Sequence, residues 1–352
     1  MSVKTEPGNF FEDFKPGQEI VHAAPRTVTE GDVSLYTALY GSRFAVQSSD
    51  MFAISLGFEA APVDDLLEFH IVFGKTVPDI SLNAVANLGY ASGRFAGAVY
   101  PGDTLRTVSQ VIGAKENSNS KTGVVYVHST GVNQRDEPVL DFVRWVMVRK
   151  GDASSPAPET VVPDLAPFVD ERELVVPEGI SLAGYDFDLA GSSLTWDDYQ
   201  VGEKIDHVDG MTIEEAEHTM ASRLYQNPAR VHFNQHVEKD GRFGRRIVYG
   251  GHIISTARAL SFNGLANAFR VCAINAGSHV APTFGGDTIY AWTEVLGRIE
   301  VPGRSDLGAL RLRTVATKDH ACADFPDKGE DGKYHESVVL DFDYTVLIPR
   351  RN

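Results

Sequence analysis

The sequence predicts an α+β protein made of two copies of one folding unit. Four segments of the first half recur, in the same order, in the second half. Each half also has one long apolar helical segment followed by segments with strand-like alternation. The chain has 352 residues, of which 43% are hydrophobic and 23% are charged, so it can bury a sizeable core. We expect one unit over 1–150, a linker over 151–190 and a second unit over 191–352.

The repetition is visible as paired segments. The offset between partners is 185 near the start of the chain, 184 in the middle and 200 at the end, so we expect an insertion around 324–336. Four matches in one order indicate a duplication. The pairs are FFEDFKPGQEI at 10–20 with TWDDYQVGEKI at 195–205, Thr27–Glu30 with Thr212–Glu215, YPGDTLRTVSQVIG at 100–113 with FGGDTIYAWTEVLG at 284–297, and VLDFVRWVMV at 139–148 with VLDFDYTVLI at 339–348.

Helix signals come first in each half. The Thr-x-x-Glu segments at 27–30 and 212–215 have the form of capping boxes and predict a short helix after each. A longer helix is expected over 61–75, with Gly74 as its stop, and another over 249–262. In the second long helix Ile253, Ala257 and Leu260 recur at helical spacing and form an apolar stripe.

Strands follow the long helices. The alternation in VVYVHST at 124–130 and in LRLRTVAT at 310–317 is typical of strands. A sheet of such strands needs the long helix to cover its apolar face, and the two copies can pair edge to edge. Residues 151–190 contain SSPAPE and three further prolines, which indicates a linker.

Composition narrows the class of protein. The formal net charge of −16 argues against nucleic acid as a partner, because binding phosphate backbones needs clustered Lys and Arg. The opening MSVKTEPGNFFEDFKPG lacks an apolar signal stretch, and no later run suits a membrane helix. Cys272 and Cys322 are too few for a disulfide scaffold and lack zinc spacing. We therefore expect a cytoplasmic protein with no metal and no membrane association.

The loop LYQNPARVHFNQH at 224–236 contains the first candidate site residue, His232. At an offset of 185 its partner is Gln47, so only the second half has an imidazole at this position. A histidine needed only for packing is expected in both copies. The asymmetry favours chemistry in the second half, although a loop histidine capped by a carbonyl stays an alternative.

A basic run lies directly after this loop. Arg242, Arg245 and Arg246 give an otherwise acidic chain a local positive patch, which suits either a solvated surface or an anionic ligand. His252 follows in the second long helix, and we expect it at a pocket edge or on the helix surface, where it could touch a substrate.

Nearly the whole chain resembles the MaoC-like double-hotdog enoyl-CoA hydratases. The G-D-T turns before strands and the loop at 224–236 carry the resemblance. The family implies a sheet wrapped around one long helix in each half, and hydration of a 2-enoyl-CoA without a cofactor. It also implies an Asp five residues before the catalytic His, and here Asn227 stands in that place before His232. Asn227 can orient water but cannot accept a proton, so acid and base work falls on His232.

The resemblance places an oxyanion donor at Gly250, at the start of the second long helix. The repeat partner of Gly250 is Asp65, which would repel an oxyanion. Asp64 or Asp65 could alternatively supply a second carboxylate to the site. A thioesterase using Asp65 and a non-catalytic acyl-CoA-binding subunit therefore stay open beside the hydratase.

Within the family, the QNPARVHFN loop and the length are most similar to members that interconvert mesaconyl-CoA and 3-methylmalyl-CoA. A substrate of this kind has a distal carboxylate, whose best partner is an arginine. We expect that arginine in the first half, with Arg43 and Arg94 as candidates, while Arg242, Arg245 and Arg246 meet the CoA phosphates. Acyl-CoA is the one expected partner, and monomer and homodimer are both open.

Overall fold

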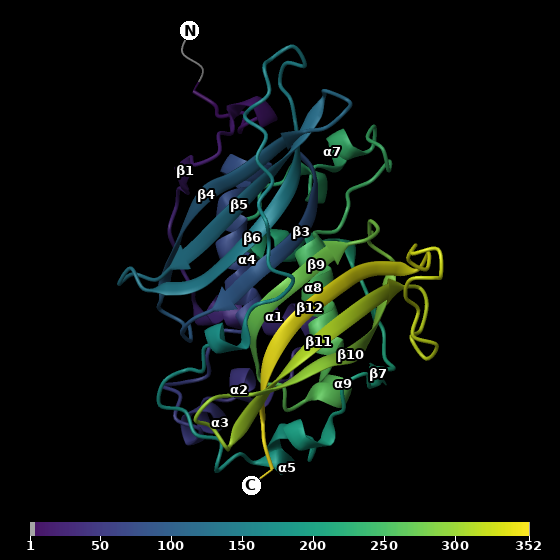
Figure 1. Cartoon of the computed structure of the whole chain (residues 1–352). Helices are drawn as coiled ribbons and strands as arrows, with labels where there is room; N and C mark the ends of the chain where they lie inside the picture. Colours follow the sequence, from purple (N-terminus) through teal and green to yellow (C-terminus); the bar gives the residue numbers. More distant parts are fainter. Residues whose placement is uncertain (1–3, 352) are drawn as a thin grey trace.

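The computed structural model describes residues 4–351 and forms one continuous antiparallel sheet (Figure 1). Its strand order is β1-β4-β5-β6-β3-β9-β12-β11-β10-β7, with the short β2 and β8 pairing to β4 and β10. The strands of the first half are β1 (Glu19–Val21), β2 (Arg26–Thr27), β3 (Ala84–Phe95), β4 (Thr104–Glu116), β5 (Thr122–Val132) and β6 (Pro138–Arg149). Those of the second half are β7 (Lys204–Asp206), β8 (Met211–Thr212), β9 (Arg270–His279), β10 (Thr288–Glu300), β11 (Leu307–Lys318) and β12 (Val338–Pro349).

The two halves meet where β3 pairs with β9. Tyr90 lies opposite Gly277 and Gly93 lies opposite Ile274. At an offset of 184 the repeat partner of Tyr90 is Ile274 and that of Gly93 is Gly277. Each pairing is therefore the symmetry copy of the other, and the junction lies on an approximate two-fold axis. The edge-to-edge pairing expected from the duplication is confirmed, and it removes two sheet edges from solvent.

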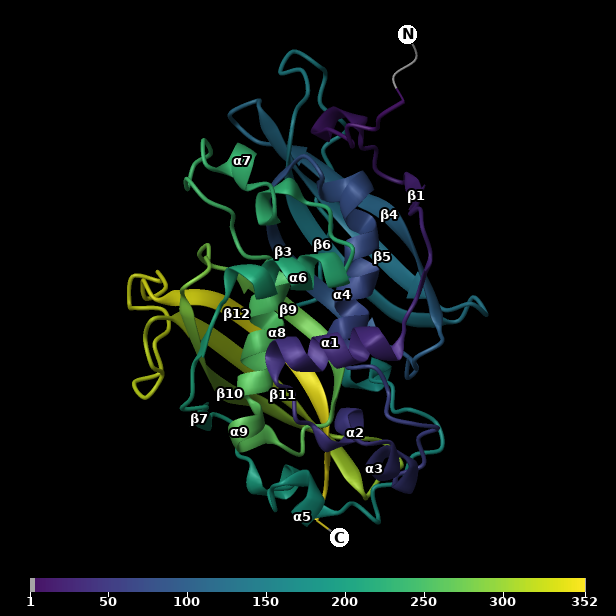
Figure 2. The same cartoon turned by 180° about the vertical axis from the view of Figure 1, so that it is seen from behind.

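The long helices α4 (Asp65–Thr76) and α8 (Gly250–Leu260) lie side by side against one face of this sheet (Figure 2). All 12 residues of α4 are buried, including the polar Asp65, Glu68, His70, Lys75 and Thr76. The α+β prediction of two repeats, each with antiparallel strands packed on one long helix, is confirmed, and the strands of both repeats join into one sheet. The other α-helices are α1 (Glu30–Tyr40), α2 (Ala45–Ser48), α3 (Asp50–Ser55), α5 (Phe187–Ala190), α6 (Glu215–Leu224), α7 (Gln235–Glu238) and α9 (Phe262–Leu265).

Polar repeat partners touch each other between the halves. The hydroxyls of Tyr40 and Tyr225 are 2.7 Å apart, and His70 Nε2 lies 2.9 Å from Ser255 Oγ. Both pairs are 185 residues apart in sequence, equal to the repeat offset. The symmetry axis therefore runs through a buried hydrogen-bonded cluster.

The capping boxes predicted at 27–30 and 212–215 do not form. Thr27 and Thr212 each end a short strand, and their hydroxyls lie 2.8 Å from Thr104 and Thr288 on the neighbouring strands. The N-cap of α1 is Thr29, whose side chain accepts from the Asp32 N–H, while α6 has no side-chain cap. The helices form where expected, but the capping boxes proposed for them are wrong.

Gly74 was expected to stop the first long helix, and this is also wrong. The residue lies inside α4, which continues to Thr76. A Cβ atom on Gly74 would come within 1.9 Å of the Tyr225 carbonyl oxygen. The glycine is therefore required by a close approach of the second half's loop to the first half's helix.

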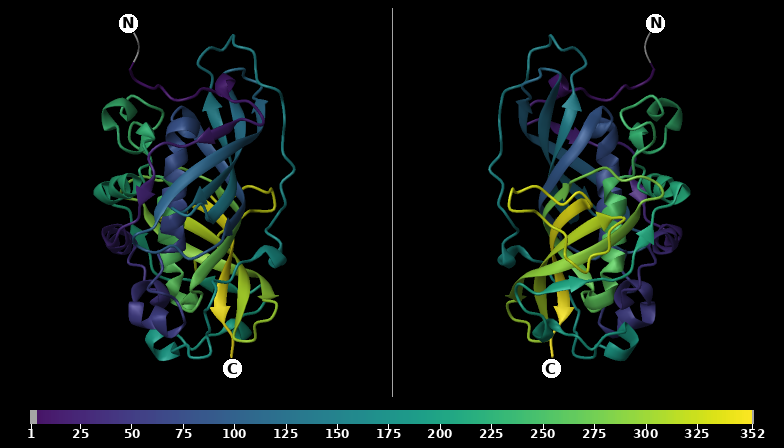
Figure 3. Two further views of the ribbon diagram at one scale, coloured as in Figure 1. Left: turned by 90° about the vertical axis from the view of Figure 1, so that its left-hand side faces the viewer. Right: turned by 90° about the vertical axis from the view of Figure 1, so that its right-hand side faces the viewer.

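Two further segments connect the halves and strands. The segment 151–190 has little regular structure beyond the 3₁₀ turn Glu171–Glu173 and α5, and it runs along the sheet on the side away from the long helices (Figure 3). The extra length of the second half lies between β11 and β12, where 319–337 replaces the short connection 133–137 of the first half. The expected insertion at 324–336 falls within this connection.

Candidate active site

His232 lies in a 3₁₀ turn (Arg230–His232) between α6 and α8, and only 8% of its surface is exposed. Its Nδ1 is 3.0 Å from the Ile247 carbonyl oxygen, which can only accept, so Nδ1 carries a proton. In the neutral ring Nε2 then keeps a lone pair. Burial lowers the pKa of His232 to about 4, although the bond to Ile247 opposes this. The imidazole is therefore held neutral, in the form that can accept a proton through Nε2.

The N-terminus of α8 lies next to this histidine. The ring of Tyr249, the residue before α8, is 5.6 Å from that of His232 and meets it edge to face. Tyr249 makes no side-chain cap, and Gly250, the first helical residue, has no partner for its N–H within the helix. Unpaired N–H groups and the helix dipole make this end suited to a developing negative charge.

His279 also faces this helix end, and the sequence did not identify it. A Cβ atom on Gly250 would lie 2.4 Å from the His279 ring, so only glycine permits the contact. His279 comes from β9, and its Nε2 is 3.1 Å from the Tyr90 hydroxyl of the first half. Burial, and secondarily His232, lower the pKa of His279 to about 4. Its repeat partner at an offset of 184 is Phe95, an asymmetry that could have marked it.

Asn227 is buried in the loop that precedes His232. Its Oδ1 accepts from the Ala229 N–H at 3.0 Å, and its own N–H donates to the Ser222 carbonyl. Within the described residues no hydrogen bond joins Asn227 to His232. The side chain therefore shapes the Asn-Pro turn, and its role in orienting water stays a prediction.

His252 is not at a pocket edge or on the helix surface. It is 3% exposed, and its Nδ1 lies 2.9 Å from the hydroxyl of Tyr40 in the other half. The face of α8 that bears His252 packs against α1 and not against solvent, because the halves bury their helices against each other. His252 thus belongs to the hydrogen-bonded cluster at the symmetry axis.

The structure does not bring Arg43 or Arg94 to His232. Arg43 is exposed between α1 and α2 and stacks over the Phe262 ring at 4.5 Å. Arg94 forms ion pairs with Asp141 at 2.8 Å and with Glu173 of the linker at 3.0 Å. Its partner Glu173 belongs to the segment that covers the sheet face away from the helices. Sequence spacing could not show which face of the sheet Arg94 would take.

The basic run after the loop divides into two parts. Arg246 is paired with Glu215 at 2.5 Å and donates to Thr219 Oγ1, so its charge is already matched. Arg242 and Arg245 are exposed and lie over aromatic rings, at 5.0 Å from Phe243 and 4.0 Å from Phe284 respectively. These two arginines have no carboxylate partner among the described residues and stay available to an anionic ligand.

The corresponding end of the first half is closed by internal bonds. Asp65, at the position of Gly250, pairs with Arg270 at 3.0 Å and accepts from the Val271 N–H at 2.8 Å. Burial raises the pKa of Asp65 to about 6, against the opposing effect of Arg270. Gln47, at the position of His232, donates to the Phe269 carbonyl. Asp65 and Gly74 are about 14 Å apart along α4 at 1.5 Å per residue, so Asp64 and Asp65 lie far from the His232 loop.

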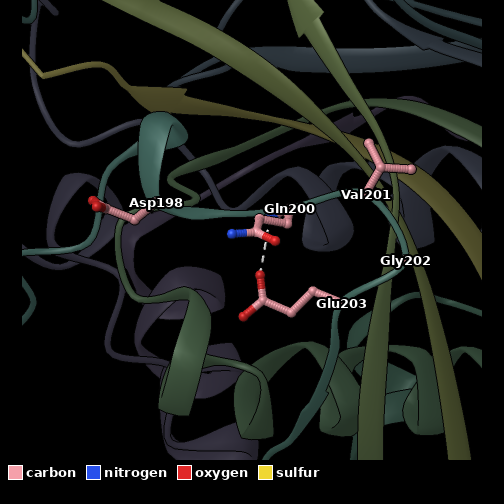
Figure 4. Close-up of a pocket in the computed structure, with 5 residues that line it drawn as sticks. All are labelled: Asp198, Gln200, Val201, Gly202 and Glu203. Atoms are coloured by element: carbon pink, nitrogen blue, oxygen red, sulfur yellow. Dashed lines mark hydrogen bonds between the residues drawn. The ribbon is translucent and has the colours of Figure 1, made fainter.

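A surface hollow elsewhere on the molecule lacks the histidine and the helix N-terminus found at the His232 site. The hollow in Figure 4 is lined by Asp198, Gln200, Val201, Gly202 and Glu203, and Glu203 accepts from the Gln200 N–H at 3.0 Å. Its lining has two carboxylates, which would repel an anionic CoA ester, and neither a histidine nor a cation. Among residues 4–351, no three His, Cys, Asp or Glu side chains are grouped to hold a metal ion. None of the described helices is long and apolar enough to cross a membrane.

The sheet, the paired helices and the histidine beside a helix N-terminus define a MaoC-like double-hotdog hydro-lyase. A crystal structure of a MaoC domain dehydratase from Chloroflexus aurantiacus matches with a TM-score of 0.98 and 69% identity over 100% of both chains. A Mycobacterium tuberculosis protein described as a double hotdog matches with a TM-score of 0.78 and 24% identity, over 98% of this chain and 99% of that one. The double-hotdog prediction is confirmed.

Sequence comparison gives the family. The family model described as mesaconyl-CoA hydratase matches residues 2–327. The chain is 70% identical over 351 residues to beta-methylmalyl-CoA dehydratase of Chloroflexus aurantiacus, with 100% of both covered. It is 58% identical over 350 residues to mesaconyl-CoA hydratase of Cereibacter sphaeroides, covering 99% of this chain and 100% of the relative. The chain belongs to the mesaconyl-CoA hydratase family, as the resemblance implied.

Proposed function

We propose that this protein catalyses the reversible addition of water to mesaconyl-CoA, giving 3-methylmalyl-CoA (beta-methylmalyl-CoA). Its two relatives are named for the two directions of one reaction, hydration in one case and dehydration in the other. The observation that carries the proposal for this chain is the neutral His232, whose Nε2 is free to accept a proton beside the N-terminus of α8.

The proposed mechanism uses one base and one oxyanion site. His232 Nε2 takes a proton from water as the water oxygen bonds to the β-carbon of the enoyl thioester. Electron density moves through the α-carbon to the thioester oxygen, where the Gly250 N–H and the dipole of α8 stabilise it. A proton returns to the α-carbon and completes the hydration, and the dehydration follows the same path in reverse. No cofactor takes part in this scheme.

Binding of CoA is assigned to the exposed part of the basic run. Arg242 and Arg245 have the free charge that phosphates require, and the backbone after them leads directly to Gly250. Arg246 is removed from this group because Glu215 already neutralises it. The thioester is thereby placed at the helix end while its phosphates stay near solvent.

The structure does not favour the thioesterase alternative. It required a carboxylate near a helix start, and Asp65 is occupied by Arg270 and the Val271 N–H. A purely binding role does not account for a base-form imidazole beside an oxyanion site.

One assay with two readouts tests the proposal. Purified protein is incubated with mesaconyl-CoA and, separately, with crotonyl-CoA, while enoyl-thioester absorbance and free thiol are followed together. We expect loss of absorbance without thiol release, and faster turnover of mesaconyl-CoA. Thiol release would instead show hydrolysis, and no change in either signal would leave only binding.

A further inference from the structure

Arg144 is a buried arginine without a carboxylate partner. It lies on β6 in the first half and has 0% exposure. Its guanidinium donates to Thr76 Oγ1 at 2.7 Å, to Ser81 Oγ at 2.8 Å and, weakly, to Asn87 Oδ1 at 3.4 Å. All three acceptors are neutral, and its Nε has no acceptor. No carboxylate oxygen of residues 4–351 lies within the 4.0 Å that defines an ion pair.

Of the other buried arginines, Arg270 forms an ion pair with Asp65 at 3.0 Å. Arg258 donates to the Ser261 hydroxyl and to the Ala268 carbonyl, and its charge opposes the rise that burial causes in the pKa of the nearby Asp64. Both belong to the closed end of the molecule. Burial lowers the pKa of Arg144 to about 10, which still leaves it charged at neutral pH. An unpaired buried charge destabilises the folded chain, so a sequence that retains one calls for a compensating role.

Arg144 is placed beside the candidate active site, on the side formed by the first half. Its guanidinium carbon is 4.4 Å from the centre of the Phe73 ring, and that ring is 5.6 Å from Tyr249. Tyr249 in turn contacts His232 and precedes Gly250. The next residue of α4, Gly74, has its Cα against the backbone of the loop at Tyr225. The rings of Phe73 and Tyr249 thus connect the cation to the loop and helix end that carry the chemistry.

We propose that Arg144 binds the distal carboxylate of the substrate and selects dicarboxylic enoyl-CoA esters over simple ones. This inference rests on the proposed function. In mesaconyl-CoA the carboxylate is attached to the carbon that gains the hydroxyl group, so its partner must lie close to the base. A guanidinium can hold it through two parallel hydrogen bonds, and the Thr76 and Ser81 hydroxyls can rotate to donate to the same oxygens.

The duplication supports a role specific to one end. At the late offset of 200 the repeat partner of Arg144 is Tyr344, which is neutral. Arg144 therefore adds a charge that the fold itself does not require at the equivalent position. The repeat partner of Phe73, at an offset of 185, is Arg258. The first half therefore places an arginine on β6 and a phenylalanine on α4, whereas the second half has a tyrosine on β12 and an arginine on α8 at the equivalent positions.

Binding of unreactive analogues tests the proposal without relying on turnover. Succinyl-CoA has a distal carboxylate and butyryl-CoA has a methyl group in its place, and neither has a double bond to hydrate. Dissociation constants for both are measured by calorimetry with the wild-type protein, Arg144→Gln and Arg144→Lys. Arg94→Gln is the matched control, because it removes an arginine of the same half whose partners are Asp141 and Glu173.

We expect the wild-type protein to bind succinyl-CoA at least tenfold more tightly than butyryl-CoA. Arg144→Gln should weaken succinyl-CoA binding roughly tenfold to hundredfold, as for a lost charge-assisted hydrogen bond, with butyryl-CoA little changed. Arg144→Lys should fall between, and Arg94→Gln should match the wild type. Equal losses for both ligands would show a structural clamp and overturn the proposal.

The wild-type measurement alone keeps the proposal falsifiable if a variant does not fold. A wild-type protein that does not distinguish succinyl-CoA from butyryl-CoA has no carboxylate site, whatever the variants do. Failure of the hydratase assay together with selective succinyl-CoA binding would instead overturn the reaction and keep the ligand class. The two hypotheses are therefore separable.

Discussion

Replacing His232 with Gln tests the base most directly, because the repeat partner of His232 is already Gln47. The variant gives the second half a side chain that the scaffold accommodates in the first. Glutamine can hydrogen-bond but cannot accept the proton from water. Turnover of mesaconyl-CoA should fall roughly 10²- to 10⁴-fold, the usual contribution of a general base. Gln47→Ala is the control, with turnover near that of the wild type despite the lost bond to Phe269.

The magnitude of the pH effect follows from burial. The pKa of His232 is lowered from 6.5 to about 4, a stabilisation of the neutral ring by about 3 kcal/mol at 1.36 kcal/mol per pH unit. The neutral ring is the active form, so activity is lost only as the pH falls through the lowered value. We expect kcat/KM for the wild-type protein to stay level from about pH 8 to 5 and to decline only near pH 4.

Unfolding must be followed in the same buffers. The folded pKa of His232 lies below the unfolded one, so the unfolded chain binds the proton first, and stability from this group is lost as the pH falls from about 6.5 toward 4. Thermal midpoints separate that loss from titration of the site. An acid limb near 6.5 in fully folded protein, or near-normal turnover of His232→Gln, would refute the reasoning.

Three further predictions concern the rest of the site. Gly250→Ala places a Cβ atom 2.4 Å from the His279 ring and should lower both turnover and the unfolding temperature; unchanged values for both would contradict the close contact. Asn227→Ala should reduce turnover, whereas Asn227→Asp should retain much of it with a shifted pH optimum. Normal steady-state rates for Asn227→Ala would show that Asn227 does not orient water. Neutralising Arg242 and Arg245 together should raise KM for CoA thioesters, more so at low salt, with kcat little changed, since such contacts are equal in ground and transition states. A KM of this double variant and of the wild type that does not change with salt concentration would contradict phosphate binding by Arg242 and Arg245.

The fold was predictable because duplication and periodicity are properties of the sequence itself. The duplication anticipated that the copies pair edge to edge, which the structure does through β3 and β9, and the growing offset anticipated the longer connection between β11 and β12. What failed were local readings that depend on partners distant in sequence. The pattern at Thr27 is typical of a helix cap, but the residue lies in a short strand and its hydroxyl contacts that of Thr104. The pattern at Gly74 is typical of a helix end, but the glycine lies inside α4 because the Tyr225 carbonyl of the other half leaves no room for a side chain.

The candidate site was predictable where the two copies differ. His232 and Gly250 stood out because Gln47 and Asp65 occupy their positions in the first half, and the structure places them at one helix end. The arginines could not be placed by the same argument. Whether Arg94 faces the helices or the linker depends on bulges in β3 that the sequence does not reveal.

The approximate two-fold axis through Tyr40 and Tyr225 has an evolutionary consequence. In a dimer of identical subunits any substitution appears at both ends, so no position can be optimised for one end alone. Here the position that is Gly250 at one end is Asp65 at the other, and each has its own neighbours. Covalent fusion of the copies frees one end to specialise in chemistry while the other becomes a rigid support locked by its own ion pair.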